Sequence, residues 1–207
     1  MRVDTNRWNR LRYTFWAPVY DLAARGLERG RRESLALLAP RPGERVLIVG
    51  AGTGADLVHL PDGCAVLAAD LTPAMLRRAR PRVRKGMHLV VADGQRLAVP
   101  DGAFDAVVLH LILAVIPDPA RCLGEAARAL RPGGRVAVFD KFLRTGRPPA
   151  WLRISNVVIR VLFTDMTRRF DDILERSGAA LETLEDRPAL FGGLYRHVLL
   201  RKGLSTR

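Results

Sequence analysis

Short apolar runs alternate with segments of helical periodicity along the chain from residue 45 onward. Runs of this length that end near glycine or aspartate are typical of buried strands in a parallel sheet. We expect strands at residues 45–49, 65–69, 88–92, 104–111, 135–140, 181–185 and 195–201. The long run at 104–111 is expected to occupy the centre of the sheet, where both faces are covered.

Helices are predicted between several of these strands. Thr72 and Pro73 suit the N-cap and first position of a helix that follows the second strand. Helical patterns also cover residues 118–130 and 167–177, and the second ends at Gly178. We interpret residues 130–134, Leu-Arg-Pro-Gly-Gly, as a helix stop followed by a tight loop. This order predicts a mostly parallel sheet with helices on both faces, which closes with a pair of strands.

Length and composition favour one domain in a reducing compartment. The chain has 207 residues, and no apolar stretch reaches the ~20 residues that a membrane-spanning helix needs. The arginine-rich N-terminus lacks the apolar core of a signal peptide. Cys64 and Cys122 are expected to be reduced core thiols, because both lie in apolar segments without metal-ligand spacing. We therefore expect a cytoplasmic protein without a metal.

The formal net charge of +13 comes from 31 arginines and three lysines. A charge of this size favours polyanionic partners, either nucleic acid or an anionic membrane surface. The excess of arginine over lysine is also what a biased base composition of the source genome would produce.

Three groups of polar or glycine residues follow expected strands, at the edge where α/β sheets bind their ligands. Residues 50–54, Gly-Ala-Gly-Thr-Gly, allow a sharp turn and close approach of the backbone to a ligand. Their spacing differs from the GxGxxG of dinucleotide-binding enzymes, and a simple strand-to-helix turn is the alternative. Asp70 could accept the hydroxyls of a ribose, and Asp93 could accept the amino group of an adenine. Each is also an ordinary residue for its position, because strands often end in aspartate and Asp-Gly is a common turn.

In order and spacing, these groups resemble the class I S-adenosylmethionine-dependent methyltransferases. The resemblance covers residues 40–140 and includes Phe104-Asp105 and the Leu-Arg-Pro-Gly-Gly turn. It implies a Rossmann-like α/β fold with a seven-stranded, mostly parallel sheet and an N-terminal helical lid. It also implies S-adenosylmethionine as cofactor and S-adenosylhomocysteine as product. The cofactor-binding residues that it implies are Gly50, Ala51, Gly52, Thr53, Gly54, Asp70, Leu71, Met75, Asp93, Gly94, Gln95 and His110.

Ile48 departs from the pattern of this family. Many members carry an acidic residue two positions before the first glycine, where it helps to place the ammonium group of the cofactor. With Ile48 at this position, that task would fall to carbonyls or to another residue. A cofactor-binding protein without activity is one consequence that the substitution leaves open.

The segment after the fourth expected strand indicates the class of methyl acceptor. Residues 109–113, Leu-His-Leu-Ile-Leu, lack the Asp/Asn-Pro-Pro-Tyr/Phe motif of enzymes that methylate exocyclic base amines. An apolar acceptor pocket fits this composition, and a role in the core alone is the alternative. His110 is a candidate catalytic group on this segment, although a buried histidine with satisfied hydrogen bonds is also common.

The N-terminal segment combines aromatic and basic residues. The membrane-binding residues that it predicts are Arg7, Trp8, Arg10, Leu11, Arg12, Phe15 and Trp16. Packing of the same helix on the sheet as a lid is the alternative, and the two roles are compatible. A second amphipathic candidate covers residues 151–163. We therefore divide the chain into residues 1–40, amphipathic helices, and residues 41–207, the methyltransferase domain.

Two further segments refine the resemblance. Residues 16–21, Trp-Ala-Pro-Val-Tyr-Asp, and residues 110–117 resemble bacterial phosphatidylethanolamine N-methyltransferases, which are themselves similar to quinone-biosynthesis methyltransferases. The resemblance implies that Tyr20 reaches the transfer site, so Tyr20 and His110 are the catalytic candidates.

The leading hypothesis from these patterns is a peripheral membrane enzyme that methylates the amine of a phospholipid. It would act as a monomer or weak oligomer, with an anionic membrane and its lipid as partners and no nucleic acid expected. C- or O-methylation of a quinone or another apolar molecule is the alternative. A nucleic-acid-binding protein with a methyltransferase-like fold is a remote alternative, because no aromatic residues are interleaved along an open basic strand face.

Overall fold

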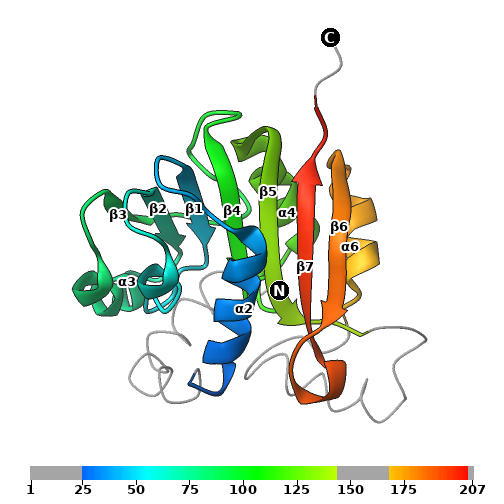
Figure 1. Cartoon of the computed structure of the whole chain (residues 1–207). Coiled ribbons are helices and arrows are strands. Elements are labelled where there is room, and N and C mark those ends of the chain that lie inside the picture. Colours follow the sequence, from blue (N-terminus) through cyan, green and yellow to red (C-terminus); the bar gives the residue numbers. More distant parts are fainter. Residues whose placement is uncertain (1–24, 144–167, 205–207) are drawn as a thin grey trace, which may run out of the picture.

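The computed structural model describes residues 25–143 and 168–204, which form a sheet covered by helices (Figure 1). The strands are β1 (Arg45–Val49), β2 (Ala65–Asp70), β3 (Met87–Val91), β4 (Phe104–His110), β5 (Leu130–Lys141), β6 (Leu181–Pro188) and β7 (Tyr195–Lys202). Their order in the sheet is β3-β2-β1-β4-β5-β7-β6. Pairing is parallel from β3 to β5, whereas β7 runs antiparallel to both of its neighbours. The predicted seven-stranded, mostly parallel sheet is therefore confirmed.

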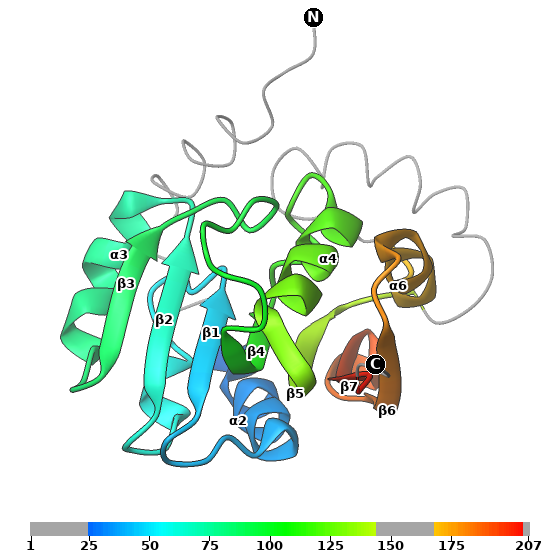
Figure 2. The same ribbon diagram turned by 90° about the horizontal axis from the view of Figure 1, so that it is seen from above.

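The helices are η1 (Arg25–Leu27), α2 (Glu28–Leu38), η2 (Leu57–His59), α3 (Pro73–Ala79), η3 (Arg80–Arg82), α4 (Pro119–Ala129), α6 (Phe170–Ser177) and η4 (Phe191–Gly193). Figure 2 shows α2 on one face of the sheet and α4 and α6 on the other. Thr72 is the N-cap of α3, with Pro73 as first residue, and the side chain of Asp118 caps α4 by accepting the amide of Arg121.

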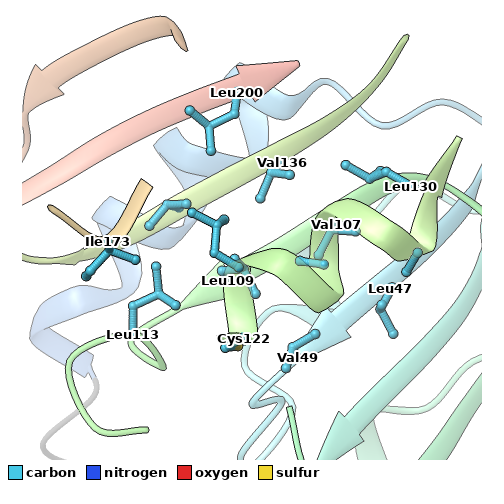
Figure 3. Packing of buried hydrophobic residues seen from close by; sticks show 14 of the residues in the cluster. Leu47, Val49, Val107, Leu109, Leu113, Cys122, Leu130, Val136, Ile173 and Leu200 are labelled. Atoms are coloured by element: carbon cyan, nitrogen blue, oxygen red, sulfur yellow. The ribbon is translucent and has the colours of Figure 1, made fainter. Parts of the chain in front are cut away.

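The core has two halves because successive strand residues point to opposite faces. Leu47, Val107 and Leu109 pack toward α4 and α6, as Figure 3 shows, whereas Ile48 and Val108 pack toward α2. Both cysteines are buried and free, and burial raises the pKa of Cys122 to about 12. Ile48, the departure from the family pattern, is thus a core residue beneath α2.

One predicted loop is part of a strand. Residues 130–134 were expected to form a tight loop, but β5 begins at Leu130, directly after α4, and Leu130 pairs with Phe104. The register then shifts, so that Ala106 pairs with Arg135. The helix does stop here, as expected, but an irregular strand continues through Gly133 and Gly134 because β4 offers a partner at once.

Other boundaries differ by a few residues. β4 ends at His110, one residue before the expected end, because Leu111 adopts a left-handed backbone with φ of 59°. α6 begins at Phe170, and the predicted start at Thr167 lies outside the described residues.

Several predictions concern parts of the chain that the structure does not describe. Tyr20, the seven N-terminal membrane-binding candidates and residues 151–163 all lie there. Within residues 25–143 and 168–204, no helix is long and apolar enough to cross a membrane. In the same ranges, no group of three or more histidine, cysteine, aspartate or glutamate residues could hold a metal ion.

Candidate active site

A pocket lies at the carboxyl ends of the parallel strands, where the sheet order reverses between β1 and β4. It contains about 680 Å³ of empty space, part of which is open to solvent. Its wall is formed by Gly50, Gly52, Asp70, Leu71, Thr72, Met75, Ala92, Asp93, Gly94, His110, Leu111, Ile112, Val115, Ile116 and Pro117.

The glycine turn after β1 forms the floor of the pocket. The amides of Gly50 and Ala51 donate to the carbonyl of Ala69 at 2.8 and 3.0 Å, which holds the turn against β2. Gly50 has φ of 75°, and a Cβ atom there would lie 2.8 Å from Cδ1 of Ile112. Glycine is therefore required at this position both for the backbone conformation and for the close approach of the opposite wall.

Asp70 ends β2 and lies in the pocket wall. One carboxylate oxygen accepts the amide of Gly52 at 2.8 Å and the other accepts the amide of Thr72 at 2.8 Å. Burial raises the pKa of Asp70, although these two amides act in the opposite direction. The carboxylate thus fixes the glycine turn and the start of α3 at once, and it presents an acceptor to a ligand in the pocket.

Asp93 and Gly94 follow β3, the neighbour of β2 in the sheet, and also line the pocket. The Asp93 carboxylate accepts the amide and the side-chain nitrogen of Gln95, and the Gln95 side-chain oxygen accepts the amide of Asp118. A Cβ atom on Gly94 would lie 2.7 Å from Cγ1 of Val49. Gln95 therefore positions Asp93 and connects it to α4, while Asp93 and Gly94 themselves line the pocket.

The segment after β4 supplies an apolar wall. Leu111, Ile112, Val115 and Ile116 line the pocket, whereas Leu109 and Leu113 are fully buried in the core. Part of this segment therefore lines the pocket and part of it belongs to the core, and its role as an acceptor pocket stays a prediction. Leu111 has a left-handed backbone, and its amide donates to the carbonyl of Phe139 at 2.8 Å. Such strain in a residue other than glycine is typical of functional sites.

A buried polar network lies behind the pocket wall. The two ring nitrogens of His110 pair with the Asp56 carboxylate at 2.7 Å and with the Ser34 hydroxyl at 2.9 Å. The second oxygen of Asp56 accepts from Arg31 at 2.7 Å, and all four residues are buried. Burial alone would raise the pKa of Asp56, but Arg31 and His110 outweigh it and hold the pKa well below its usual range. The network connects α2, the segment after the glycine turn and the end of β4.

Two side chains hold the apolar wall in place from behind. Asp140, fully buried, accepts the amides of Ala114 and Lys141 at 2.9 and 2.8 Å. The Arg168 guanidinium donates to the carbonyls of Leu113 and Ile116. The wall is therefore fixed by charged groups that do not themselves line the pocket.

The pocket brings together eight of the twelve residues expected at the cofactor site. Gly50, Gly52, Asp70, Leu71, Met75, Asp93, Gly94 and His110 line it, whereas Ala51, Thr53, Gly54 and Gln95 lie behind its surface. Sequence reasoning missed Thr72, Ala92 and the Asp56 network. The network left no local signal, because its members are up to 79 residues apart in the chain and meet only in the fold.

These residues fit an adenosine-containing cofactor. A carboxylate at the end of β2 suits ribose hydroxyls, Asp93 and Gly94 suit an adenine, and the glycine turn leaves room for a chain bearing a sulfonium group. Asp70 and Asp93 are the acidic residues of the described wall, and Asp56 is already paired with Arg31 and His110. No carboxylate of the described wall replaces the one that Ile48 removes.

Comparison with known proteins places the chain in a family. A methyltransferase-domain family model matches residues 47–138. A phosphatidylethanolamine N-methyltransferase of Cereibacter sphaeroides is 34% identical over 190 residues, 88% of this chain and 92% of that protein. A demethylmenaquinone methyltransferase of Thermus thermophilus is 36% identical over 158 residues, 71% of this chain and 69% of that protein.

A solved structure agrees at the level of the fold. An S-adenosylmethionine-dependent methyltransferase from Mesorhizobium loti aligns with a TM-score of 0.64 and 21% identity, covering 82% of this chain and 96% of that one. The pocket, its strand-end carboxylates and these likenesses lead to one conclusion: the chain belongs to the S-adenosylmethionine-dependent methyltransferases, in the family that includes phosphatidylethanolamine N-methyltransferases and demethylmenaquinone methyltransferases.

Proposed function

We propose that the protein transfers methyl groups from S-adenosylmethionine to the amine of phosphatidylethanolamine and its methylated intermediates. The observation that carries this proposal is the likeness to the Cereibacter sphaeroides enzyme, which extends over nearly the whole of both chains. The apolar wall of Leu111, Ile112, Val115 and Ile116 supports it, because a lipid brings apolar chains to the pocket.

The chain's own residues would act mainly by alignment. When bound, the cofactor supplies an electrophilic methyl group, and the acceptor nitrogen must approach it in line. Asp70, Asp93 and the glycine turn would hold the nucleoside, and the wall fixed by Asp140 and Arg168 would orient the acceptor. A rigid wall suits this task, since small misalignments of reacting atoms cost large factors in rate.

The acceptor amine must lose a proton before it can attack. An alkylammonium group has a pKa near ~10, so deprotonation needs an acceptor in the site. We assign this role to Tyr20, on the strength of the resemblance alone. His110 has both ring nitrogens engaged by Asp56 and Ser34, so we assign it to the polar part of the wall.

A labelling experiment tests the proposal. The protein is incubated with methyl-labelled S-adenosylmethionine and liposomes that contain phosphatidylethanolamine and demethylmenaquinone, and the extracted lipids are separated. Label in the mono- to trimethylated phospholipids is the expected result. Label in the quinone alone would replace the proposal with the alternative, which the likeness to the Thermus thermophilus enzyme supports.

Membrane association belongs to the same proposal. We propose that the protein is a cytoplasmic enzyme that binds anionic membranes peripherally through residues 7–16, supported by the net charge of +13. Residues 1–40 would serve as the membrane-contacting part and residues 41–207 as the catalytic domain. We further propose a monomer or a weak oligomer.

A further inference from the structure

A lysine lies at the carboxyl end of β5 with its charge facing an aromatic ring. Lys141 is the last residue of β5 and pairs with Tyr195 of β7, and its ammonium nitrogen lies 5.7 Å from the centroid of the Tyr195 ring. The side chain is half-buried. Burial lowers the pKa of Lys141, and Asp140 opposes this only in part.

Within the part of the chain that the structure describes, Lys141 forms no ion pair through its ammonium group. The neighbouring Asp140 points to the other face of the strand, where it is occupied by the amides of Ala114 and Lys141. Lys202 offers a contrast, because its ammonium donates to the carbonyls of Ala127 and Leu130 and stabilises the end of α4. Lys141 has no comparable structural task.

Lys141 is close to the cofactor pocket. His110, in the pocket wall, pairs with Phe139 of β5, and Lys141 follows two residues later. Strand geometry puts the Cα atoms of His110 and Lys141 about 8 Å apart. The centroid of the buried Phe139 ring lies 5.9 Å from that of His110 and 5.4 Å from that of Tyr195, so a packed aromatic cluster connects the pocket wall to the lysine.

An exposed aromatic residue flanks this cation. Phe191, in the connection between β6 and β7, is 68% exposed, and its ring lies 5.7 Å from that of Tyr195. Figure 1 shows this connection at the same end of the sheet as the tip of β5. Phe191 has φ of 52°, a conformation that costs a bulky residue energy, yet the side chain is hardly buried. A strained and exposed aromatic residue indicates a contact with something other than the chain's own core.

We propose that Lys141, Tyr195 and Phe191 form a subsite for the acceptor lipid, beside the methyl-transfer site. Lys141 would bind the phosphate, the buried Tyr195 ring would hold the lysine side chain in place, and the exposed Phe191 would contact the apolar part of the lipid next to the phosphate. The inference rests on the proposed function. Phosphatidylethanolamine carries its one permanent anion two carbons and an oxygen away from the nitrogen that is methylated. A cation beside the pocket can therefore hold the phosphate while the amine faces the cofactor.

Binding of a short-chain phosphatidylethanolamine, followed by phosphorus NMR in the presence of S-adenosylhomocysteine, tests the subsite without relying on turnover. Lys141→Met should weaken binding about tenfold, as expected for loss of a charge-assisted contact. Lys141→Arg should bind within about threefold of the parent, since the charge remains. Lys85→Met is the matched control, because it removes one exposed positive charge elsewhere and should change nothing. All variants should bind S-adenosylhomocysteine as the parent does.

A second comparison separates a lipid from a free phosphate. Phe191→Ser should weaken binding of the short-chain lipid but leave phosphoethanolamine and inorganic phosphate unaffected. Unchanged lipid binding in Lys141→Met would overturn the subsite. Equal binding of inorganic phosphate and lipid, with no effect of Phe191→Ser, would overturn its assignment to a lipid.

The binding and labelling experiments distinguish a failure of the proposed subsite from a failure of the proposed function. If liposome lipid is methylated equally by the parent and Lys141→Met, the subsite is wrong and the proposed function stands. If the parent labels quinone alone and does not bind the short-chain lipid, the proposed function fails and the subsite fails with it.

Discussion

Asp70 is the residue whose position in the pocket most directly predicts an effect on cofactor binding. Its carboxylate already holds the amides of Gly52 and Thr72, so Asp70→Ala should lose both the ligand contacts and the shape of the turn. Charge-assisted hydrogen bonds contribute ~1.5–3 kcal/mol each, so affinity for S-adenosylmethionine should fall at least tenfold by calorimetry. Asp62→Ala, which removes an exposed carboxylate, should bind normally. Unchanged affinity in Asp70→Ala would exclude the proposed ribose contact.

Asp56 does not line the pocket, so we expect its substitution to change the stability of the folded protein and not its contacts with a ligand. Asp56→Asn removes the carboxylate charge that pairs with the buried Arg31, which should cost about 3–5 kcal/mol in the free energy of unfolding. Because the folded-state pKa of Asp56 is lowered, this stabilisation is complete above the unfolded pKa of ~3.9. It is lost as pH falls below that value toward the folded pKa. Urea unfolding of both proteins at several pH values measures the difference, and a gap that does not shrink below pH ~4 would contradict the assignment.

At the scale of elements, α2 shows how packing can reverse a helix propensity. Replacing glycine by alanine inside a helix usually stabilises it by about 1 kcal/mol. At Gly30, however, a Cβ atom would lie 2.2 Å from Cζ of Phe139 in β5. Gly30→Ala should therefore lower the free energy of unfolding by about 1–3 kcal/mol, through overpacking.

A nearby glycine provides the control. A Cβ atom on Gly26, in η1, would meet nothing within 4 Å, so Gly26→Ala should leave denaturant stability nearly unchanged. Equal effects of the two substitutions would mean that α2 does not pack on β5 as closely as the structure indicates.

At the scale of the whole molecule, charge and aromatic residues predict different responses of membrane binding. Arginines near an anionic surface contribute about 1 kcal/mol each, and salt screens this attraction. Insertion of Trp8, Leu11 and Phe15 would add an apolar part of ~1.5–3 kcal/mol per buried side chain. Raising salt should thus weaken binding to anionic vesicles without abolishing it, whereas neutral vesicles should bind poorly.

The double variant Trp8→Ala, Phe15→Ala isolates the apolar part. It should bind anionic vesicles less well than the parent at every salt concentration, in a sedimentation assay. If the folded variant sediments like the parent at low and high salt, residues 7–16 act as a lid instead, and residues 151–163 become the next segment to test.

The sequence alone determined the order of the strands along the chain and most residues of the pocket wall, whereas the cofactor class was implied by its resemblance to a known family. The strands and the pocket residues could be predicted because apolar runs, closely spaced glycines and strand-end aspartates are local signals in the sequence. Their position at one edge of the sheet follows from parallel pairing. The strand that replaces the loop at Leu130 was decided by the presence of a partner strand, which no local pattern reports.

Only the tertiary structure decided which residues support the site from behind. Ser34 and Asp56 meet at His110 across 76 and 54 positions of sequence, and Arg168 reaches the wall across 52. Lys141 acquires its aromatic neighbour only because β7 pairs antiparallel with β5. Contacts of this kind depend on the paths of strands that are distant in the chain. The sequence therefore contains these residues but does not show that they meet.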